Sequence, residues 1–272
     1  CYPNYIFKNP VPILASIGDQ MSALFGQACF ERGQAKCTIG TAMTISAITG
    51  EYENVISDSD VVPAIASNLS GKITYEIEDG AFTAGSVNDW LIDNLHLVKD
   101  YEEINTLAAS VESSDGVYFV PAFQGTGAPY WDDTARALII GLSKFHDIRH
   151  ICRAALESIA FQAYEVTRQI EKAGIKINTI RVDGGGAKSD FLLQSIADIV
   201  NCRVERPSNT DCTAMGSIYI AGLSCGIWDN IDEIKNIWHL SKAFTPEIDE
   251  IYRKKLIKGW NEASLRSLNW AK

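Results

Sequence analysis

The 272-residue sequence has no surplus of basic residues, since it holds 24 Lys and Arg against 34 Asp and Glu, a formal net charge of −10. A chain with this acidic balance is poorly suited to neutralising phosphates, which argues against a general nucleic-acid binder. It also has no apolar run close to the ~20 residues that a membrane-spanning helix needs. We therefore expect neither nucleic acid nor a membrane as a partner.

Paired cysteines and zinc-like spacings are missing as well. The seven cysteines are scattered without a C-x-x-C pair, so neither a disulfide framework nor a metal centre is indicated. The closest histidines, His146 and His150, are separated by Asp-Ile-Arg, which is not the zinc-protease helix pattern. These features predict free thiols, a cytoplasmic location and no metal site built from protein ligands.

The first residues, Cys1-Tyr2-Pro3-Asn4, include no initiator Met and lack the basic-then-apolar pattern of a signal peptide. We expect the chain to begin partway through a longer polypeptide. Its length suits one large domain or two small ones. A hydrophobic fraction of 46% with 21% charged residues is typical of a globular protein.

Hydrophobic periodicity predicts that strands and helices alternate. Strands are expected at 36–49, with a bend permitted by Gly40, and at 72–78, 179–182 and 203–205. Helices are expected at 19–26, 86–97 (with Ser86 as N-cap), 148–172, 189–200, 213–222 and 246–270. This order predicts an α/β fold with helices on both faces of a sheet.

Four places can carry chemistry, and each has a structural alternative. The glycines of 183–186 follow a predicted strand, where backbone N–H groups can approach a phosphate or where the glycines only make the turn. Gly40-Thr41 can contact a phosphate or form a β-bulge. Asp19 can act as a general base or as a helix N-cap. The aromatic run 119–131 can be a substrate platform, although core packing is the safer interpretation.

Taken together, these segments resemble the FGGY family of sugar and polyol kinases, most closely its glycerol-phosphorylating members. Gly18-Asp19-Gln20 and the following Ala-Leu-Phe-Gly-Gln27 resemble a family signature, and Lys36–Thr41 is similar to the family's phosphate-binding hairpin. Further similar segments are 117–131, 137–157, 181–185, 204–207, 213–216 and 222–228. They follow in family order and at family spacing along nearly the whole chain.

The resemblance implies an actin-like (ribonuclease H-like) ATPase domain with a mixed sheet and helices on both faces. Family members are roughly twice this long, so the chain looks like their C-terminal half. Residues 1–34 would be the interdomain segment and the helix carrying the catalytic aspartate. Residues 35–272 would be the C-terminal, nucleotide-binding domain, and the partner implied is the family's N-terminal domain, which this sequence does not contain.

The activity implied is transfer of a phosphoryl group from ATP, with Mg²⁺, to glycerol, giving ADP and sn-glycerol 3-phosphate. This half alone is expected to turn over little or nothing. By resemblance Asp19 removes the proton from the acceptor hydroxyl, and Gln20 contacts the substrate beside it. The nucleotide-binding positions implied are Gly40, Thr41, Gly85, Asp89, Gly184, Gly185 and Ser189.

Three positions depart from the pattern of the glycerol-phosphorylating members. Thr44, in the substrate site, stands where an aromatic usually packs against glycerol; Asp89 replaces a common Gln, and Ser189 replaces a common Asn. Residues 184–189 are similar to those of xylulose kinases in the family. Another small polyol or a pentulose such as xylulose therefore stays open as acceptor, as does a non-catalytic actin-like nucleotide-binding module. A homo-oligomer is a further expectation, since the family often forms dimers or tetramers.

Overall fold

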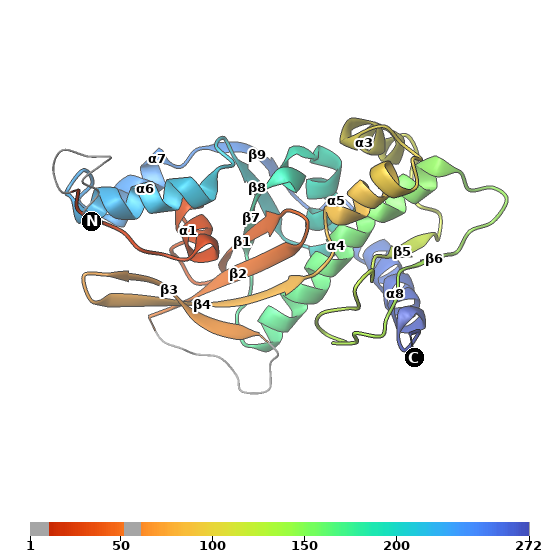
Figure 1. Cartoon of the computed structure of the whole chain (residues 1–272), viewed down its shortest axis with the longest axis horizontal. Coiled ribbons are helices and arrows are strands. Elements are labelled where there is room, and N and C mark those ends of the chain that lie inside the picture. Colours follow the sequence, from red (N-terminus) through yellow and green to blue (C-terminus); the bar gives the residue numbers. More distant parts are fainter. Residues whose placement is uncertain (1–10, 52–60, 272) are drawn as a thin grey trace.

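The computed structural model describes residues 11–51 and 61–271. Its centre is a seven-stranded sheet in the order β3-β4-β2-β1-β7-β8-β9, beside a two-stranded sheet of β5 and β6 (Figure 1). The strands are β1 (Gln34–Ile39), β2 (Met43–Gly50), β3 (Val62–Leu69), β4 (Lys72–Ala81), β5 (Tyr118–Val120), β6 (Leu138–Ile140), β7 (Thr179–Asp183), β8 (Arg203–Pro207) and β9 (Leu240–Phe244).

Helices flank this sheet. The α-helices are α1 (Asp19–Gly26), α2 (Ser86–Asp89), α3 (Tyr101–Ala109), α4 (Ile148–Lys172), α5 (Asp190–Val200), α6 (Cys212–Ser224), α7 (Ile231–Ile237) and α8 (Glu250–Ser267). A π-helical turn, Trp90–Asn94, continues α2, and a 3₁₀ turn, Gly185–Lys188, precedes α5.

The large sheet is mixed, as predicted. β1 runs parallel to β7 and β7 parallel to β8, whereas β3, β4, β2 and β1 are joined by antiparallel pairings and β9 is antiparallel to β8. β1 and β2 form the hairpin whose bend the sequence predicted at Gly40.

One face of the sheet packs against α4. Ile39 and Ile45 of the hairpin are fully buried in the main core together with Leu156 and Ile159 of α4. The 25-residue α4 has the bounds that the sequence predicted, and it ends before Gly174, whose φ is +90°. A left-handed glycine of this kind is a common helix terminator.

α1 and α6 lie together on the opposite side of the sheet (Figure 1). They approach closely because both helices have a glycine at the contact: a Cβ on Gly216 would collide with the backbone oxygen of Ser22, and one on Gly26 with that of Cys212. Ser22 Oγ also donates to Thr213 O at 2.7 Å. Helices are therefore present on both faces, which is the predicted layering.

Some expectations were wrong in detail. Gly85, not Ser86, stands at the N-cap of α2, and the α-helical part of the predicted helix ends at Asp89. Gly18 caps α1, so Asp19 is its first helical residue and not its N-cap. The last helix begins at Glu250 because Asp249 caps it by accepting from Tyr252 N. Sequence analysis did not predict β3, β5, β6, β9, α3 or α7.

No helix among the described residues is long and apolar enough to span a membrane. The six cysteines in residues 11–51 and 61–271 are free thiols. Burial raises the pKa of most of them, and that of Cys29 is raised to about 12.

Candidate active site

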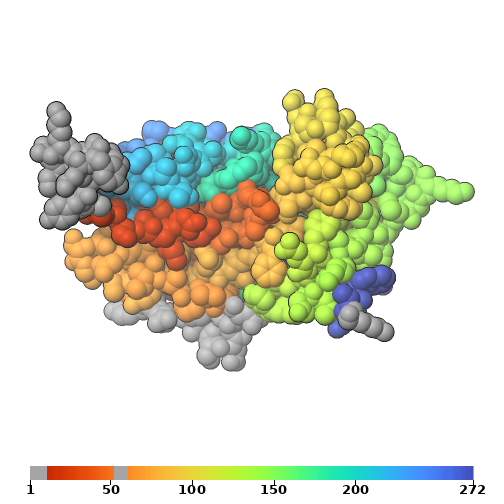
Figure 2. Space-filling model, viewed as in Figure 1, coloured from red at the N-terminus to blue at the C-terminus, as the bar shows by residue number. Residues whose placement is uncertain are grey.

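A cavity of about 780 Å³ opens where the β1–β2 turn, α2, α3 and the start of α5 meet. Its lining includes six of the predicted nucleotide-binding residues: Gly40, Thr41, Gly85, Asp89, Gly185 and Ser189. In Figure 2 the red-to-orange surface of the hairpin adjoins the yellow surface of α3. The volume is within the range of ~300–1,000 Å³ usual for small-molecule sites.

Backbone contacts fix the hairpin turn beside α2. Gly85 N donates to Gly40 O and Ala84 N donates to Thr41 O, both at 2.8 Å. A Cβ on Gly85 would lie 2.5 Å from Gly40 O, so this approach requires glycine. Ser86 Oγ donates to Thr41 O at 3.0 Å, which explains why its side chain is not a helix cap. The two turns therefore form one wall of the cavity.

The two predicted glycines after β7 have different roles. Gly184 has φ +81°, and a Cβ there would lie 2.6 Å from Ile39 O; it is not among the residues that line the cavity. Gly185 borders the cavity, and its Cβ position has no atom within 4 Å. The structural alternative thus describes Gly184, while Gly185 leaves room for a ligand.

Side-chain pairs complete the wall opposite the glycines. Ser189 caps α5, accepting from Leu192 N at 3.0 Å, and its hydroxyl donates to Asn105 Oδ1. The Tyr101 hydroxyl donates to Asp89, and this hydrogen bond, with burial, raises the pKa of Tyr101 to about 12. The two residues that depart from the family pattern, Asp89 and Ser189, are therefore each paired with a residue of α3.

Asp19 and Gln20, which are predicted to contact the phosphoryl acceptor, lie at the start of α1. The Asp19 side chain is exposed, and its Oδ1 accepts from Gln20 N at 2.8 Å. Gln20 Oε1 accepts from Lys36 Nζ, which also donates to Thr38 Oγ1 at 3.2 Å. Thr38 stands opposite Thr44 in the β1–β2 pairing. Since paired residues point to the same face of a sheet, Thr44 and the Lys36–Gln20 contact share one face.

Sequence analysis did not single out the buried charges on this face. Lys36 and Glu76 are both 0% exposed, and neither Glu76 carboxylate oxygen has a hydrogen-bond partner among the described residues. Burial and neighbouring Glu78 raise the pKa of Glu76 to about 7, against the opposing charge of Lys36. Asp183, just before the glycine turn, has its pKa raised by burial and accepts from Gln27 Nε2 at 2.9 Å. The sequence feature that could have pointed to these buried charges is Lys36, a lysine in a segment otherwise rich in Thr, Ile and Ala.

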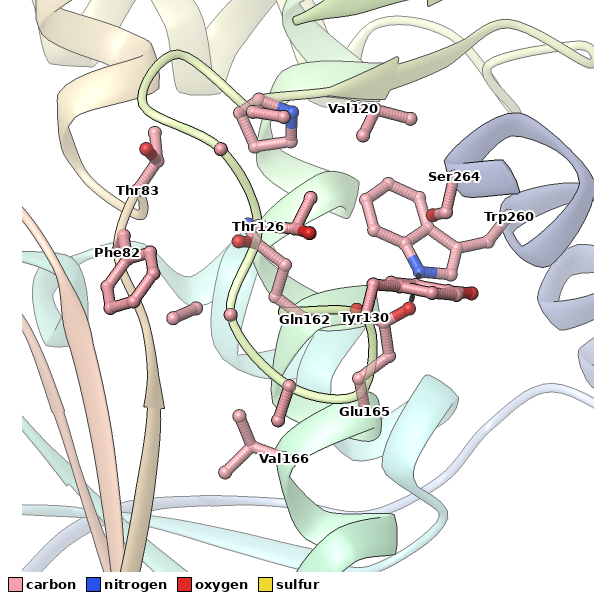
Figure 3. Close-up of a pocket in the computed structure, with 16 residues that line it drawn as sticks. Phe82, Thr83, Val120, Thr126, Tyr130, Gln162, Glu165, Val166, Trp260 and Ser264 are labelled. Carbon is pink, nitrogen blue, oxygen red and sulfur yellow. Dashed lines mark hydrogen bonds between the residues drawn. The ribbon is translucent and has the colours of Figure 1, made fainter. Parts of the chain in front are cut away.

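The aromatic segment lines a different, smaller cavity, of about 30 Å³. Figure 3 shows Tyr130 of this segment crossing over Glu165 of α4 and Trp260 of α8, with Phe82 at the far end. Trp260 Nε1 donates to Glu165 Oε1 at 2.9 Å. None of the predicted site residues lines this cavity, and Phe119 and Val120 are buried in the core. Phe119 and Val120 therefore follow the packing alternative, whereas Trp131 at the end of the run is 54% exposed.

The fold is that of an α/β domain with a glycine-lined cavity, and the sequence places it in a family. Residues 35–225 match the model of the C-terminal domain of the FGGY family of carbohydrate kinases. The chain belongs to this family.

Curated relatives refine that placement. The chain is 44% identical over 268 residues to glycerol kinase 2 of Sulfolobus acidocaldarius, covering 98% of this chain and 54% of the relative. It is 46% identical over 260 residues to glycerol kinase of Staphylococcus haemolyticus, covering 95% and 52%. The chain therefore spans about half the length of the curated relatives that it matches.

Solved structures agree with the actin-like fold class. Glycerol kinase of Plasmodium falciparum with ADP superposes with a TM-score of 0.87 at 38% identity, covering 93% of this chain and 50% of that structure. Xylulose kinase of Lactobacillus acidophilus superposes with a TM-score of 0.80 at 23% identity, covering 90% and 49%, which supports the fold alone.

Proposed function

We propose that this chain is the C-terminal, ATP-binding part of a glycerol kinase, which converts ATP and glycerol to ADP and sn-glycerol 3-phosphate. The observation that carries this proposal is one cavity lined by six predicted nucleotide-binding residues, in a chain whose relatives at about 45% identity are glycerol kinases. Those relatives do not favour a pentulose or a non-catalytic nucleotide-binding module.

We assign the nucleotide to the residues that line the cavity, and the phosphoryl acceptor to the start of α1, whose Asp19 and Gln20 are not among the lining residues. Gly40, Thr41, Gly85 and Gly185 approach the nucleotide through their backbone, and the open Cβ position of Gly185 leaves no side chain to block it. Asp89 and Ser189 border it through their pairs with α3. Gly184 makes the turn after β7 and does not line the cavity.

At the acceptor end Asp19 is the general base. Its exposed carboxylate can accept the proton of the attacking hydroxyl as the phosphoryl group transfers in line. Gln20 contacts the same substrate, and Thr44 lies along the sheet beside it. A loose transition state needs only partial deprotonation of the attacking hydroxyl, so a carboxylate suffices as the base.

Mg²⁺ fits the oxygen chemistry of this site. In residues 11–51 and 61–271, no three His, Cys, Asp or Glu side chains form a metal cluster. Mg²⁺ bound with a nucleotide needs only one or two carboxylates besides phosphate oxygens and water, and we expect its principal protein ligand in the family's N-terminal domain, which leaves Asp19 free to act as the base. When bound, the ion would neutralise charge on the transferring phosphoryl group.

We also propose a partner domain, an oligomeric state and a location for this chain. The catalytic site is completed by the family's N-terminal domain, with residues 1–34 as the connection and 35–272 as the C-terminal domain. A homo-oligomer and a cytoplasmic location are proposed too, the latter because free thiols persist in a reducing compartment.

The test is ADP release from Mg-ATP by this chain joined to its native upstream sequence. We expect release to depend on glycerol, and to exceed that with erythritol, xylulose or ribulose. The chain alone, under the same conditions, should release little or no ADP. Turnover only with another acceptor would reassign the substrate, and ADP release without any polyol dependence would contradict the kinase proposal.

A further inference from the structure

Lys36 is a buried cation with a direct link to the acceptor end of the site. It is 0% exposed on β1, and its Nζ donates to Gln20 Oε1 and to Thr38 Oγ1. Lysine is almost never fully buried without a partner, because burying an ammonium costs much of its hydration. The position therefore calls for an explanation beyond packing.

The chemistry of an ammonium fixes the orientation of the Gln20 amide. Lys36 Nζ has only donors, so the amide atom that faces it must be the carbonyl oxygen. The Gln20 NH₂ group, with its two donors, is then turned away from Lys36. The neighbouring Asp19 carboxylate, when ionised, can only accept. Gln20 thus offers hydrogen-bond donors to a ligand, and the adjacent Asp19 offers acceptors.

We propose that Lys36 is a positioning residue: it holds Gln20 so that the amide NH₂ donates to one hydroxyl oxygen of the acceptor, while Asp19 accepts from the hydroxyl that attacks. This inference rests on the proposed function. Because Lys36 is buried, it acts on the acceptor through Gln20. Two hydroxyls on adjacent carbons of a small polyol satisfy both side chains at once.

The surroundings of Lys36 explain why a cation is kept there. Buried Glu76 and Asp183 both feel its charge, which lowers the pKa of each against the effect of burial. Glu78, on the same face as Glu76, accepts from Ser46 Oγ at 3.0 Å. Lys36 thus lies among acidic groups while its own hydrogen bonds go to Gln20 and Thr38.

The first experiment measures steady-state kinetics of the chain with its native upstream sequence, with Mg-ATP and glycerol. Lys36→Met keeps the side-chain length and removes the donor. The KM for glycerol should rise about three- to tenfold, the effect of one lost hydrogen bond. The KM for ATP and kcat should change by less than about twofold, since neither depends on Gln20 orientation. Equal losses for ATP and glycerol would overturn the proposal.

A double variant tests the route through Gln20. If Lys36 acts through that amide, Lys36→Met combined with Gln20→Ala has the glycerol KM of Gln20→Ala alone. A Lys36→Met effect as large in the Gln20→Ala background as in the parent would overturn the proposal.

Gln20→Glu tests the polarity without touching the buried position. Gln20 is half-buried in the first turn of α1, where an acidic side chain is favourable, so the variant should fold. It keeps an oxygen toward Lys36 but replaces the donor by an acceptor. We expect the glycerol KM to rise about three- to tenfold, because the donated hydrogen bond is lost and the acceptor hydroxyl has to turn its own proton toward the carboxylate. A KM within about twofold of the parent would show that Gln20 does not donate to the acceptor.

A spectroscopic readout separates this inference from the proposed function. In ¹⁵N-glutamine-labelled protein, the side-chain NH₂ signal of Gln20 is identified by its loss in Gln20→Ala. It should shift in Lys36→Met without any acceptor present, and no shift would overturn the contact. If the parent shows no glycerol-dependent ADP release, the proposed function fails, while this signal still reports whether Lys36 holds Gln20.

Discussion

The two faces of the central sheet bury different chemistry. Toward α4, Cys37 and Ile45 belong to a continuous apolar core. On the other face Lys36, Ser46 and Glu76 are equally buried, yet polar or charged. Neighbouring residues of one strand therefore have different roles. Those on the apolar face contribute stability, and we propose that those on the polar face orient groups near the start of α1.

The largest expected effect is on the polar side. Asp19→Asn, in the chain with its native upstream sequence, should lower kcat about 10²- to 10⁴-fold, because the base is lost. The affinity for ATP should stay within about twofold, measured by calorimetric titration. Asp249→Asn is a matched control, since Asp249 also stands at a helix start but only caps α8. Equal losses of turnover and ATP affinity in Asp19→Asn would contradict its assignment as base.

A pair of adjacent substitutions compares the faces directly. Ile45→Ala should lower the free energy of unfolding by about 2–5 kcal/mol, through lost burial and the cavity left behind. Ser46→Ala, on the opposite face, loses only the hydrogen bond to Glu78 and should cost about 1 kcal/mol. Urea unfolding of both variants measures the difference. Costs of the same size would remove the distinction between the faces.

α4, the helix that covers the apolar face, carries a buried acidic residue, Glu165, which contacts Trp260 of α8. Burial raises the pKa of Glu165 to about 8 from an ordinary 4.5, against the hydrogen bond from Trp260 (Figure 3). Between these values the unfolded chain has released the proton and the folded chain retains it. This contribution to stability is therefore full below pH 4.5 and falls as the pH rises toward 8.

Glu165→Gln has no proton to release, so its stability should depend less on pH. The two proteins should differ in slope by up to about 1.4 kcal/mol per pH unit within that window. Thermal unfolding across the window measures this slope. Parallel curves for the two proteins would mean that Glu165 is ionised in the folded chain.

The smallest effect is expected at Thr44. Thr44→Phe introduces the aromatic that the family resemblance implies at this position, and should lower the KM for glycerol about three- to tenfold through added apolar contact. The KM for ATP should not change. Thr44→Val is the control for the lost hydroxyl, and a changed ATP affinity in Thr44→Phe would move Thr44 from the acceptor to the nucleotide end.

The sequence was most informative where the signal is local. The apolar stripe of 148–172 predicts α4, and glycines after two strands predict the turns that border the cavity. β3 was missed because it contains Pro63 and leaves most residues at least partly exposed, so it lacks a buried-strand pattern. Lys36 was missed for another reason: its partners Gln20 and Glu76 meet it only through helix docking and sheet register.

The docking of α1 has a consequence for motion. Gly26 and Gly216 let α1 and α6 meet at backbone distance, and Arg181 donates to Ala28 O at 3.0 Å just after α1. These contacts hold α1, with Asp19 at its start, against the sheet that carries the glycine turns. In any opening and closing of the complete polypeptide, the separation between this carboxylate and the nucleotide cavity would stay constant, and the acceptor would have to be delivered to a stationary base.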